Sequence, residues 1–174
     1  MNRRELHFIT RRKEQELINK LLTIVDTRKF DPQDTALIMV SPDYSATVAM
    51  HLAHAWSKDG DMLSVIPVDV TYPDEQKDQY VEKFRHDMAW HKEKFKHVVL
   101  VEAGIIRGGN WEWLIEEFKA LGYTREEMTL IALCENVGSR VKSDYVGEYY
   151  NDETHELMFY YERYNKHSVS YTHL

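Results

Sequence analysis

Four short apolar runs dominate the hydrophobic pattern of the chain. They cover residues 35–40, 62–70, 98–101 and 128–134, and aliphatic side chains make up most of each run. Runs of this length are typical of strands that are covered on both faces, as in a parallel sheet. Pro67 lies inside the second run and favours an edge position for that strand, because proline cannot donate a backbone hydrogen bond.

Stretches with apolar residues at helical spacing lie before and between these runs. We expect helices in residues 5–29, 46–58, 71–96 and 110–121, each with one apolar face. Gly122 follows the last of them and suits a helix C-cap. Strands that alternate with helices in this way predict an α/β fold with a doubly wound, mainly parallel sheet.

The 174 residues have the size of one domain. We expect an N-terminal helix within residues 1–30 and an α/β core in residues 35–134. The remaining residues, 135–174, are rich in loops and aromatic side chains, with one expected strand at residues 157–161.

The composition excludes several classes of function. A net charge of -7 gives no indication of a nucleic-acid-binding surface. No apolar run approaches the roughly 18 residues that a membrane span needs, so we expect no membrane partner. Cys134 is the single cysteine and cannot form an internal disulfide, which favours a cytoplasmic location.

The candidate ligand-binding residues are concentrated in residues 97–110, which read H-V-V-L-V-E-A-G-I-I-R-G-G-N. We expect a strand at 98–101, then a loop with an acid, three glycines and an arginine, and then a helix. Glycines let the backbone approach an anion, and the N–H groups at the start of a helix point at it. The pattern indicates either a phosphate site or a tight turn without a ligand. In doubly wound sheets, ligands bind at the carboxyl ends of strands, here after residues 40, 70 and 101.

Together, these loops resemble those of the type I phosphoribosyltransferases, most closely the hypoxanthine-guanine branch. V-L-V-E-A-G-I-I-R-G-G-N keeps the spacing of the family's loop for the ribose hydroxyls and 5-phosphate. Residues 142–147 (K-S-D-Y-V-G) are similar to the family's K-P-D-[FY]-V-G, and residues 159–165 (F-Y-Y-E-R-Y-N) resemble its closing aromatic strand. Thr71-Tyr72 stands where the mobile loop of the family carries Ser-Tyr. The resemblance covers residues 35–166 and implies a small C-terminal hood and tail in residues 135–174.

Several residues depart from the family pattern where its chemistry lies. Glu102 keeps the first acid of the ribose-binding pair, but Ala103 replaces the second. Ile106 stands at the usual catalytic acid position, and an isoleucine cannot transfer a proton. Arg107 and Asn110 replace two threonines; the arginine adds a planar cationic donor for a phosphate.

The other departures fall in separate loops. Ser41-Pro42-Asp43 replaces Lys-Gly-Gly, and Asp43 would repel pyrophosphate. Glu135 replaces the lysine that reads the exocyclic oxygen of the purine. Arg163 replaces the Mg²⁺-linked aspartate, with Glu162 beside it.

We therefore expect a phosphoribosyltransferase-like protein that has lost normal transferase chemistry. It retains an anion site for a phosphorylated sugar or a nucleotide, or it serves protein interaction, and no cofactor is required. The candidate ligand-binding residues are Glu102, Arg107, Gly108, Gly109, Asn110, Ser41, Tyr44, Ser45 and Tyr145.

Two other functions stay open at this point. A divergent active phosphoribosyltransferase or a nucleotide- or ribosyl-processing enzyme would hold Mg²⁺ with Glu102 and either Glu162 or Asp152. A protein-binding modulator would use the acidic surface and the helix in residues 71–96. Members of the family commonly dimerise, so the resemblance also implies a homodimer.

Further side chains have both a functional and a structural interpretation. His51 and His54 have a spacing that can bind a metal, although packing or a surface position is the default. Trp113 lies off the apolar stripe of its helix, facing either a partner or a stacked base. We expect core positions for Trp111 and Cys134, and solvated positions for His86, His91 and His97. Tyr145, Tyr149 and Tyr150 cluster where the family stacks its base, or else close the core.

Overall fold

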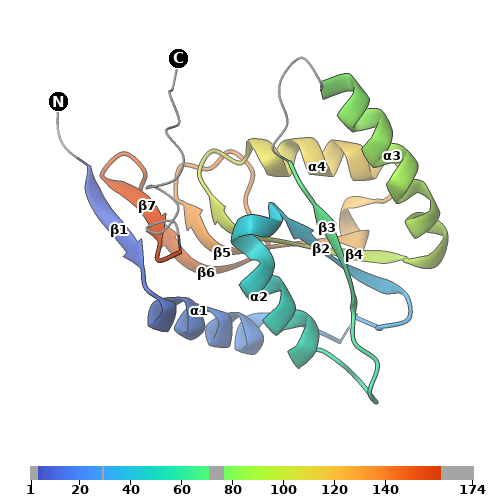
Figure 1. Ribbon diagram of the computed structural model, residues 1–174, viewed down its shortest axis with the longest axis horizontal. Coiled ribbons are helices and arrows are strands. Elements are labelled where there is room, and N and C mark those ends of the chain that lie inside the picture. The colour runs from blue at the N-terminus through green and yellow to red at the C-terminus, as the bar shows by residue number, and fades with distance from the viewer. Residues whose placement is uncertain (1–3, 29, 71–76, 162–174) are drawn as a thin grey trace.

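A five-stranded parallel sheet runs through the middle of the molecule (Figure 1). The computed structural model describes residues 4–28, 30–70 and 77–161. The strand order is β3-β2-β4-β5-β6. The strands are β2 (Thr35–Val40), β3 (Ser64–Val68), β4 (His97–Ile105), β5 (Met128–Asn136) and β6 (Tyr145–Tyr150). The predicted α/β fold with a mainly parallel sheet is confirmed, and β3, with Pro67, lies at an edge as expected.

Two helices cover each face of the sheet (Figure 1). They are α1 (Arg11–Ile24) and α2 (Pro42–Ala55) on one face, and α3 (Lys77–Lys94) and α4 (Gly109–Ala120) on the other. Successive side chains of a strand point to opposite faces, so β4 serves both layers. Val99 and Val101 pack against α1 and α2, whereas Val98 and Leu100 pack against α3 and α4. The all-apolar character of these strands follows from this double burial.

A second, two-stranded sheet joins the two ends of the described chain. In it, β1 (Glu5–Ile9) pairs in parallel with β7 (His155–Phe159). The prediction of one helix through residues 5–29 is therefore wrong at its start. Thr10 is the N-cap of α1, and its hydroxyl accepts a hydrogen bond from Lys13 N, which fixes the first helical turn after β1. The small hood is thus built from both ends of the chain and not from residues 135–174 alone.

The remaining differences from the prediction concern element boundaries and one missed strand. β4 continues to Ile105 and β5 to Asn136, and α2 begins at Pro42, which suits the first position of a helix. β6 was not predicted, because its sequence Y-V-G-E-Y-Y mixes apolar, charged and aromatic residues, as an edge strand can. Thr71 and Tyr72 lie outside the described residues. Among the helices that the structure describes, none is both long and apolar enough to cross a membrane.

Two further side chains differ from their expected environment. His97 is buried and its Nε2 lies 2.9 Å from Thr129 Oγ1, so its expected solvated position is wrong. Trp113 packs against Tyr80 and Phe84, with ring centroids 5.9 and 5.2 Å away. It therefore extends the core between α3 and α4 and does not stack on a ligand.

Replacing Gly147 by Ala is expected to lower the free energy of unfolding by about 2 kcal/mol, because a methyl group overpacks this site. An added carbon would lie 2.5 Å from Leu133 O and 3.3 Å from Leu17 Cβ. Thermal unfolding measures the loss, which corresponds to several degrees in a domain of this size. Gly109→Ala is the control, since nothing lies within 4 Å of the added carbon there. Equal melting temperatures for the two variants would contradict the packing explanation.

Candidate functional site

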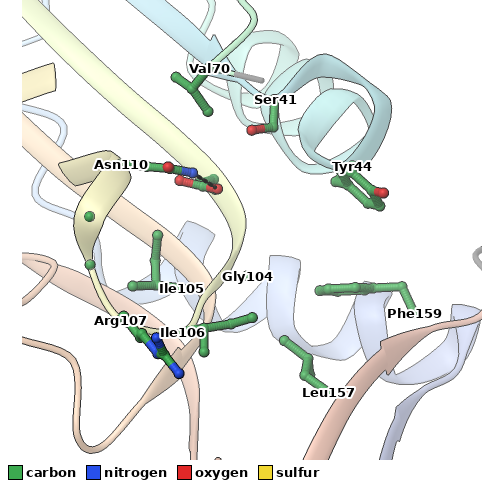
Figure 2. Close-up of a pocket in the computed structure, with 13 residues that line it drawn as sticks. Ser41, Tyr44, Val70, Gly104, Ile105, Ile106, Arg107, Asn110, Leu157 and Phe159 are labelled. Atoms are coloured by element: carbon green, nitrogen blue, oxygen red, sulfur yellow. Dashed lines mark hydrogen bonds between the residues drawn. The ribbon is translucent and has the colours of Figure 1, made fainter. Parts of the chain in front are cut away.

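A cavity of about 800 Å³ opens at the carboxyl end of the sheet. Figure 2 shows Ser41 and Tyr44 on one side of it, the loop from Gly104 to Asn110 on another, and Leu157 and Phe159 of β7 on a third. The volume is typical of a pocket for a small molecule. The lining residues are Ser41, Tyr44, Val70, Glu102, Gly104, Ile105, Ile106, Arg107, Gly108, Gly109, Asn110, Leu157 and Phe159.

The N-terminus of α4 forms part of the pocket wall. Gly108 is the N-cap, with a φ of 81°, and no side chain caps the helix there. A side chain at this position would clash, since an added carbon would lie 2.6 Å from Ser139 Oγ and 3.0 Å from Val141 N. The N–H groups of the first helical turn have no acceptor within the helix, so they are suited to an anion.

A second helix N-terminus reaches the same cavity. Ser41 is the N-cap of α2, and its φ of 49° is in the left-handed region, which a non-glycine residue seldom adopts. The side chain of Ser41 does not cap the helix. Asp43 lies in the first turn of α2 and is exposed, so its negative charge offsets the positive end of that helix dipole and weakens the attraction for an anion. α4 also has an acid in its first turn, Glu112, but that carboxylate is paired with Arg140 at 3.0 Å. The start of α4 is therefore the better anion site of the two.

Glu102 is the one carboxyl group among the described residues that line the cavity. Only 5% of the residue is exposed. Its Oε1 accepts a hydrogen bond of 3.0 Å from Asn110 Nδ2, whereas its Oε2 has no hydrogen-bond partner in the described part of the chain. Burial raises the pKa of Glu102 to about 7, and the hydrogen bond from Asn110 opposes this rise. Both protonation states are therefore populated at neutral pH.

Arg107 supplies the positive charge of the pocket. Its side chain is exposed, and its backbone oxygen accepts a hydrogen bond of 3.2 Å from Arg140 N. Ile106 beside it is 53% exposed. The site thus places a cation and a helix N-terminus close to an apolar side chain that cannot donate or accept a proton.

The opposite wall is apolar and comes from the hood. Leu157 and Phe159 of β7 approach β4 at Gly104, where an added carbon would lie 3.0 Å from Leu157 Cδ2 and 3.3 Å from Phe159 Cε2. Tyr161 stacks on Phe159 and donates a hydrogen bond of 3.0 Å to Tyr44 O. Gly104 therefore allows the hood to pack closely against the central strand.

Most of the predicted ligand-binding residues lie together in this pocket. Ser41, Tyr44, Glu102, Arg107, Gly108, Gly109 and Asn110 line it. Ser45 and Tyr145 do not. Ser45 is fully buried and its hydroxyl donates to Val40 O, while Tyr145 OH accepts a hydrogen bond from Asp26 N on the α1 side of the sheet. The structure also corrects the expected loop after residue 101, because Glu102 and Gly104 belong to β4.

Sequence reasoning missed five lining residues, namely Val70, Gly104, Ile105, Leu157 and Phe159. The alternation of Leu157 and Phe159 in the expected last strand was the available signal, since both point to the same face. Nothing in the local sequence indicated that this face covers the carboxyl end of β4.

Other candidates from the sequence lie away from the pocket. Glu135 is fully buried, and its carboxylate accepts a hydrogen bond of 2.8 Å from Ser143 N. Asp152 accepts one of 2.7 Å from Asn136 Nδ2. Glu162 and Arg163 lie outside the described residues. Within the described ranges, no group of three His, Cys, Asp or Glu side chains could hold a metal ion.

Cys134 is a core residue, as predicted. It is fully buried, and burial raises its pKa to about 12, so the reactive thiolate is not formed at neutral pH. Trp111 is also fully buried and donates a hydrogen bond of 2.9 Å to Ser143 Oγ. Tyr150 is buried, whereas Tyr149 is 55% exposed. The tyrosines of β6 therefore do not form a platform in the pocket.

Replacing Glu102 by Gln is expected to remove a pH dependence of stability. The folded protein holds the proton of Glu102 with a pKa of about 7, against an ordinary value of 4.5. The stabilising effect of this bound proton is fully present below pH 4.5, the ordinary pKa of a glutamate. It is lost as the pH rises through about 7, the pKa of Glu102 in the folded protein. The loss amounts to about 3 kcal/mol. Denaturant unfolding of both proteins between pH 4 and 8 measures it, and parallel curves would contradict a proton-linked Glu102.

No family model and no curated protein matches the chain. Its fold, however, is similar to that of solved enzymes. A purine phosphoribosyltransferase from Pyrococcus horikoshii Ot3 is 19% identical, with a TM-score of 0.61 over 91% of this chain and 93% of that chain. A xanthine-guanine-hypoxanthine phosphoribosyltransferase from Helicobacter pylori is 12% identical, with a TM-score of 0.63 over 95% of this chain and 97% of that chain.

A hypothetical protein from Neisseria gonorrhoeae with bound ppGpp is similar as well. It is 12% identical, with a TM-score of 0.60 over 95% of this chain and 96% of that chain. The chain therefore has the fold of the purine phosphoribosyltransferases.

Proposed function

We propose that the pocket binds a phosphorylated ribose or a nucleotide and that the chain does not carry out phosphoribosyl transfer. One observation carries the proposal. An uncapped helix N-terminus, an arginine and a buried glutamate line a single cavity, and one carboxyl oxygen of this glutamate has no hydrogen-bond partner in the described part of the chain. A ligand with a phosphate and sugar hydroxyls satisfies all three.

The phosphate belongs at the start of α4. The N–H groups after Gly108 can donate to its oxygens, and the helix dipole favours its negative charge. Arg107 can donate two parallel hydrogen bonds to the same group. No carboxylate of the described residues forms an ion pair with Arg107 that would compete for its guanidinium.

The sugar hydroxyls belong at Glu102. A hydroxyl donor at Oε2 would satisfy the oxygen that has no partner, while Asn110 keeps Oε1. Leaving a buried acceptor unsatisfied costs about 1–3 kcal/mol, so a ligand that supplies the donor recovers this energy. Binding is expected to favour the carboxylate form of Glu102.

Two side chains support the proposed absence of transfer. Ile106 occupies the position where the resemblance places a catalytic acid, and it is exposed to the cavity. Glu135, at the position of the base-reading lysine, is turned into the protein interior.

The hood supplies the apolar side chains of Leu157 and Phe159, which suit the uncharged face of a base or a ribose. A nucleotide is supported by the N. gonorrhoeae protein, which has the same fold and bound ppGpp.

Replacing Arg107 by Ala is expected to weaken the binding of ribose 5-phosphate by about 10- to 100-fold, because a charge-assisted hydrogen bond contributes about 1.5–3 kcal/mol. Isothermal titration calorimetry measures the change. Arg12→Ala is the matched control, since Arg12 is an exposed arginine of α1 that pairs with Glu16 at 2.9 Å and does not line the cavity. Equal affinities of wild type and the Arg107 variant would contradict the placement of the phosphate.

A second function is favoured by the raised pKa of Glu102. A carboxyl group with a pKa of about 7 is suited to general acid–base catalysis at neutral pH. It could accept a proton from a water molecule that attacks C1′ of a nucleoside 5′-phosphate, releasing the base and ribose 5-phosphate. Release of a purine base by the wild-type protein, with none from Glu102→Gln, would establish this reaction. The absence of release at millimolar substrate would leave binding as the function.

A role as a protein-binding module has less support. The apolar stripe of α3 packs into the core through Phe84 and Met88. Trp90 is the one large apolar side chain of the described part of α3 that is exposed, at 58%. A single exposed aromatic residue does not form the extended apolar patch that marks a protein interface.

A further inference from the structure

Three consecutive backbone oxygens, at the end of β4 and in the loop before α4, accept hydrogen bonds from separate segments of the chain. Tyr150 OH donates to Ile105 O at 3.2 Å, Asn136 Nδ2 to Ile106 O at 2.9 Å, and Arg140 N to Arg107 O at 3.2 Å. The donors come from β6, from the end of β5 and from the loop that follows β5.

Asn136 is the centre of this restraint. It is 3% exposed, and its Nδ2 also donates to Asp152 Oδ1 at 2.7 Å. Its Oδ1 accepts hydrogen bonds from Gly138 N at 3.1 Å and Asp152 N at 3.2 Å. The amide therefore uses both of its donors and both acceptor positions. It links the ligand loop to the turn that leads into β7 of the hood.

These bonds fix the direction of the N–H groups in the loop. A peptide unit is planar and trans, so the N–H of one residue points opposite to the C=O of the residue before it. Holding the oxygens of Ile105, Ile106 and Arg107 fixes the peptide units that lead directly into the first turn of α4, and so the direction in which that turn presents its N–H groups. Binding sites gain affinity when such donors are oriented before the ligand arrives, because no ordering is needed on binding.

We propose that Asn136 and Tyr150 are positioning residues of the ligand site. Neither side chain lines the cavity, and both act through the backbone of residues 105–107. This inference rests on the proposed function, because it assigns these two side chains a part in ligand affinity. The orientation of the empty loop is a consequence that can be measured separately.

Two variants remove the bonds with little other change. Tyr150→Phe deletes the hydroxyl and keeps the ring in the core. The double variant Asn136→Asp with Asp152→Asn preserves the total charge and allows the bond between the two side chains to form in the reverse direction. The new carboxylate can still accept from Gly138 N and from the backbone N of residue 152, but it cannot donate to Ile106 O. Tyr149→Phe is the control, since Tyr149 is an exposed neighbour on the same strand.

The test combines three measurements on the full chain. These are the melting temperature, the affinity for ribose 5-phosphate and for inorganic phosphate, and the hydrogen exchange of the peptide covering residues 104–112 without ligand. We expect both variants to bind ribose 5-phosphate at least tenfold more weakly and to exchange the loop amides at least tenfold faster. The exchange of the central strands should change much less, and Tyr149→Phe should match wild type.

Two results would overturn the positioning role. One is wild-type affinity in both variants together with a lower melting temperature, which is the effect of a purely structural contact. The other is unchanged exchange of the loop in both variants. If wild type itself binds neither probe, the proposed function fails, and the loop exchange alone then decides whether Asn136 and Tyr150 orient the backbone.

Discussion

The pairing of β4 with strands on both sides is the constraint on which the rest of the structure depends. The chain runs outward from β2 to β3 and then returns to place β4 on the other side of β2. The loops after β2 and β4 therefore leave in opposite directions and open a crevice at this switch point. Pairing of β4 with β5 continues to Ile105, so the strand carries Glu102 into the interior before the chain turns. The pocket is a consequence of this topology, and the hood strand β7 gives it a third wall (Figure 2).

The protonation and hydrogen bonding of Glu102 are unusual for a carboxyl group whose role is only to stabilise the fold. A buried carboxyl group with a raised pKa and an oxygen without a partner in the described chain costs folding energy. Arg107 is exposed and does not offset this cost, because the pKa of Glu102 is set by burial and by the hydrogen bond from Asn110. Groups that violate the usual rules of burial are expected where ligands bind, because the ligand supplies the missing partner.

Much of the fold could be predicted from the sequence because four core strands are buried on both faces and read as continuous apolar runs. The loop chemistry of Arg107 to Asn110 was equally local, and the pocket contains it. The missed features depend on contacts between distant segments. The missed strands are β1 and β6. β1 pairs only with β7 in the two-stranded sheet, and β6 lies at the edge of the five-stranded sheet, so neither β1 nor β6 has the apolar pattern of a central strand. Leu157 and Phe159 reach the pocket only through that packing. Tyr145 likewise contacts a distant segment, at Asp26, whereas Ser45 is held locally by its hydrogen bond to Val40 O. The homodimer and the cytoplasmic location stay predictions.

The central claim is that the N-terminus of α4 binds a phosphate group. An NMR titration of the ¹⁵N-labelled protein with ribose 5-phosphate tests it most directly, because backbone amides that donate to a phosphate move strongly downfield. If the phosphate binds at the start of α4, we expect saturable downfield shifts for the amides that follow Gly108, with smaller changes at Glu102 and in β7. Shifts confined to other parts of the chain, or no shift at millimolar ligand, would contradict it.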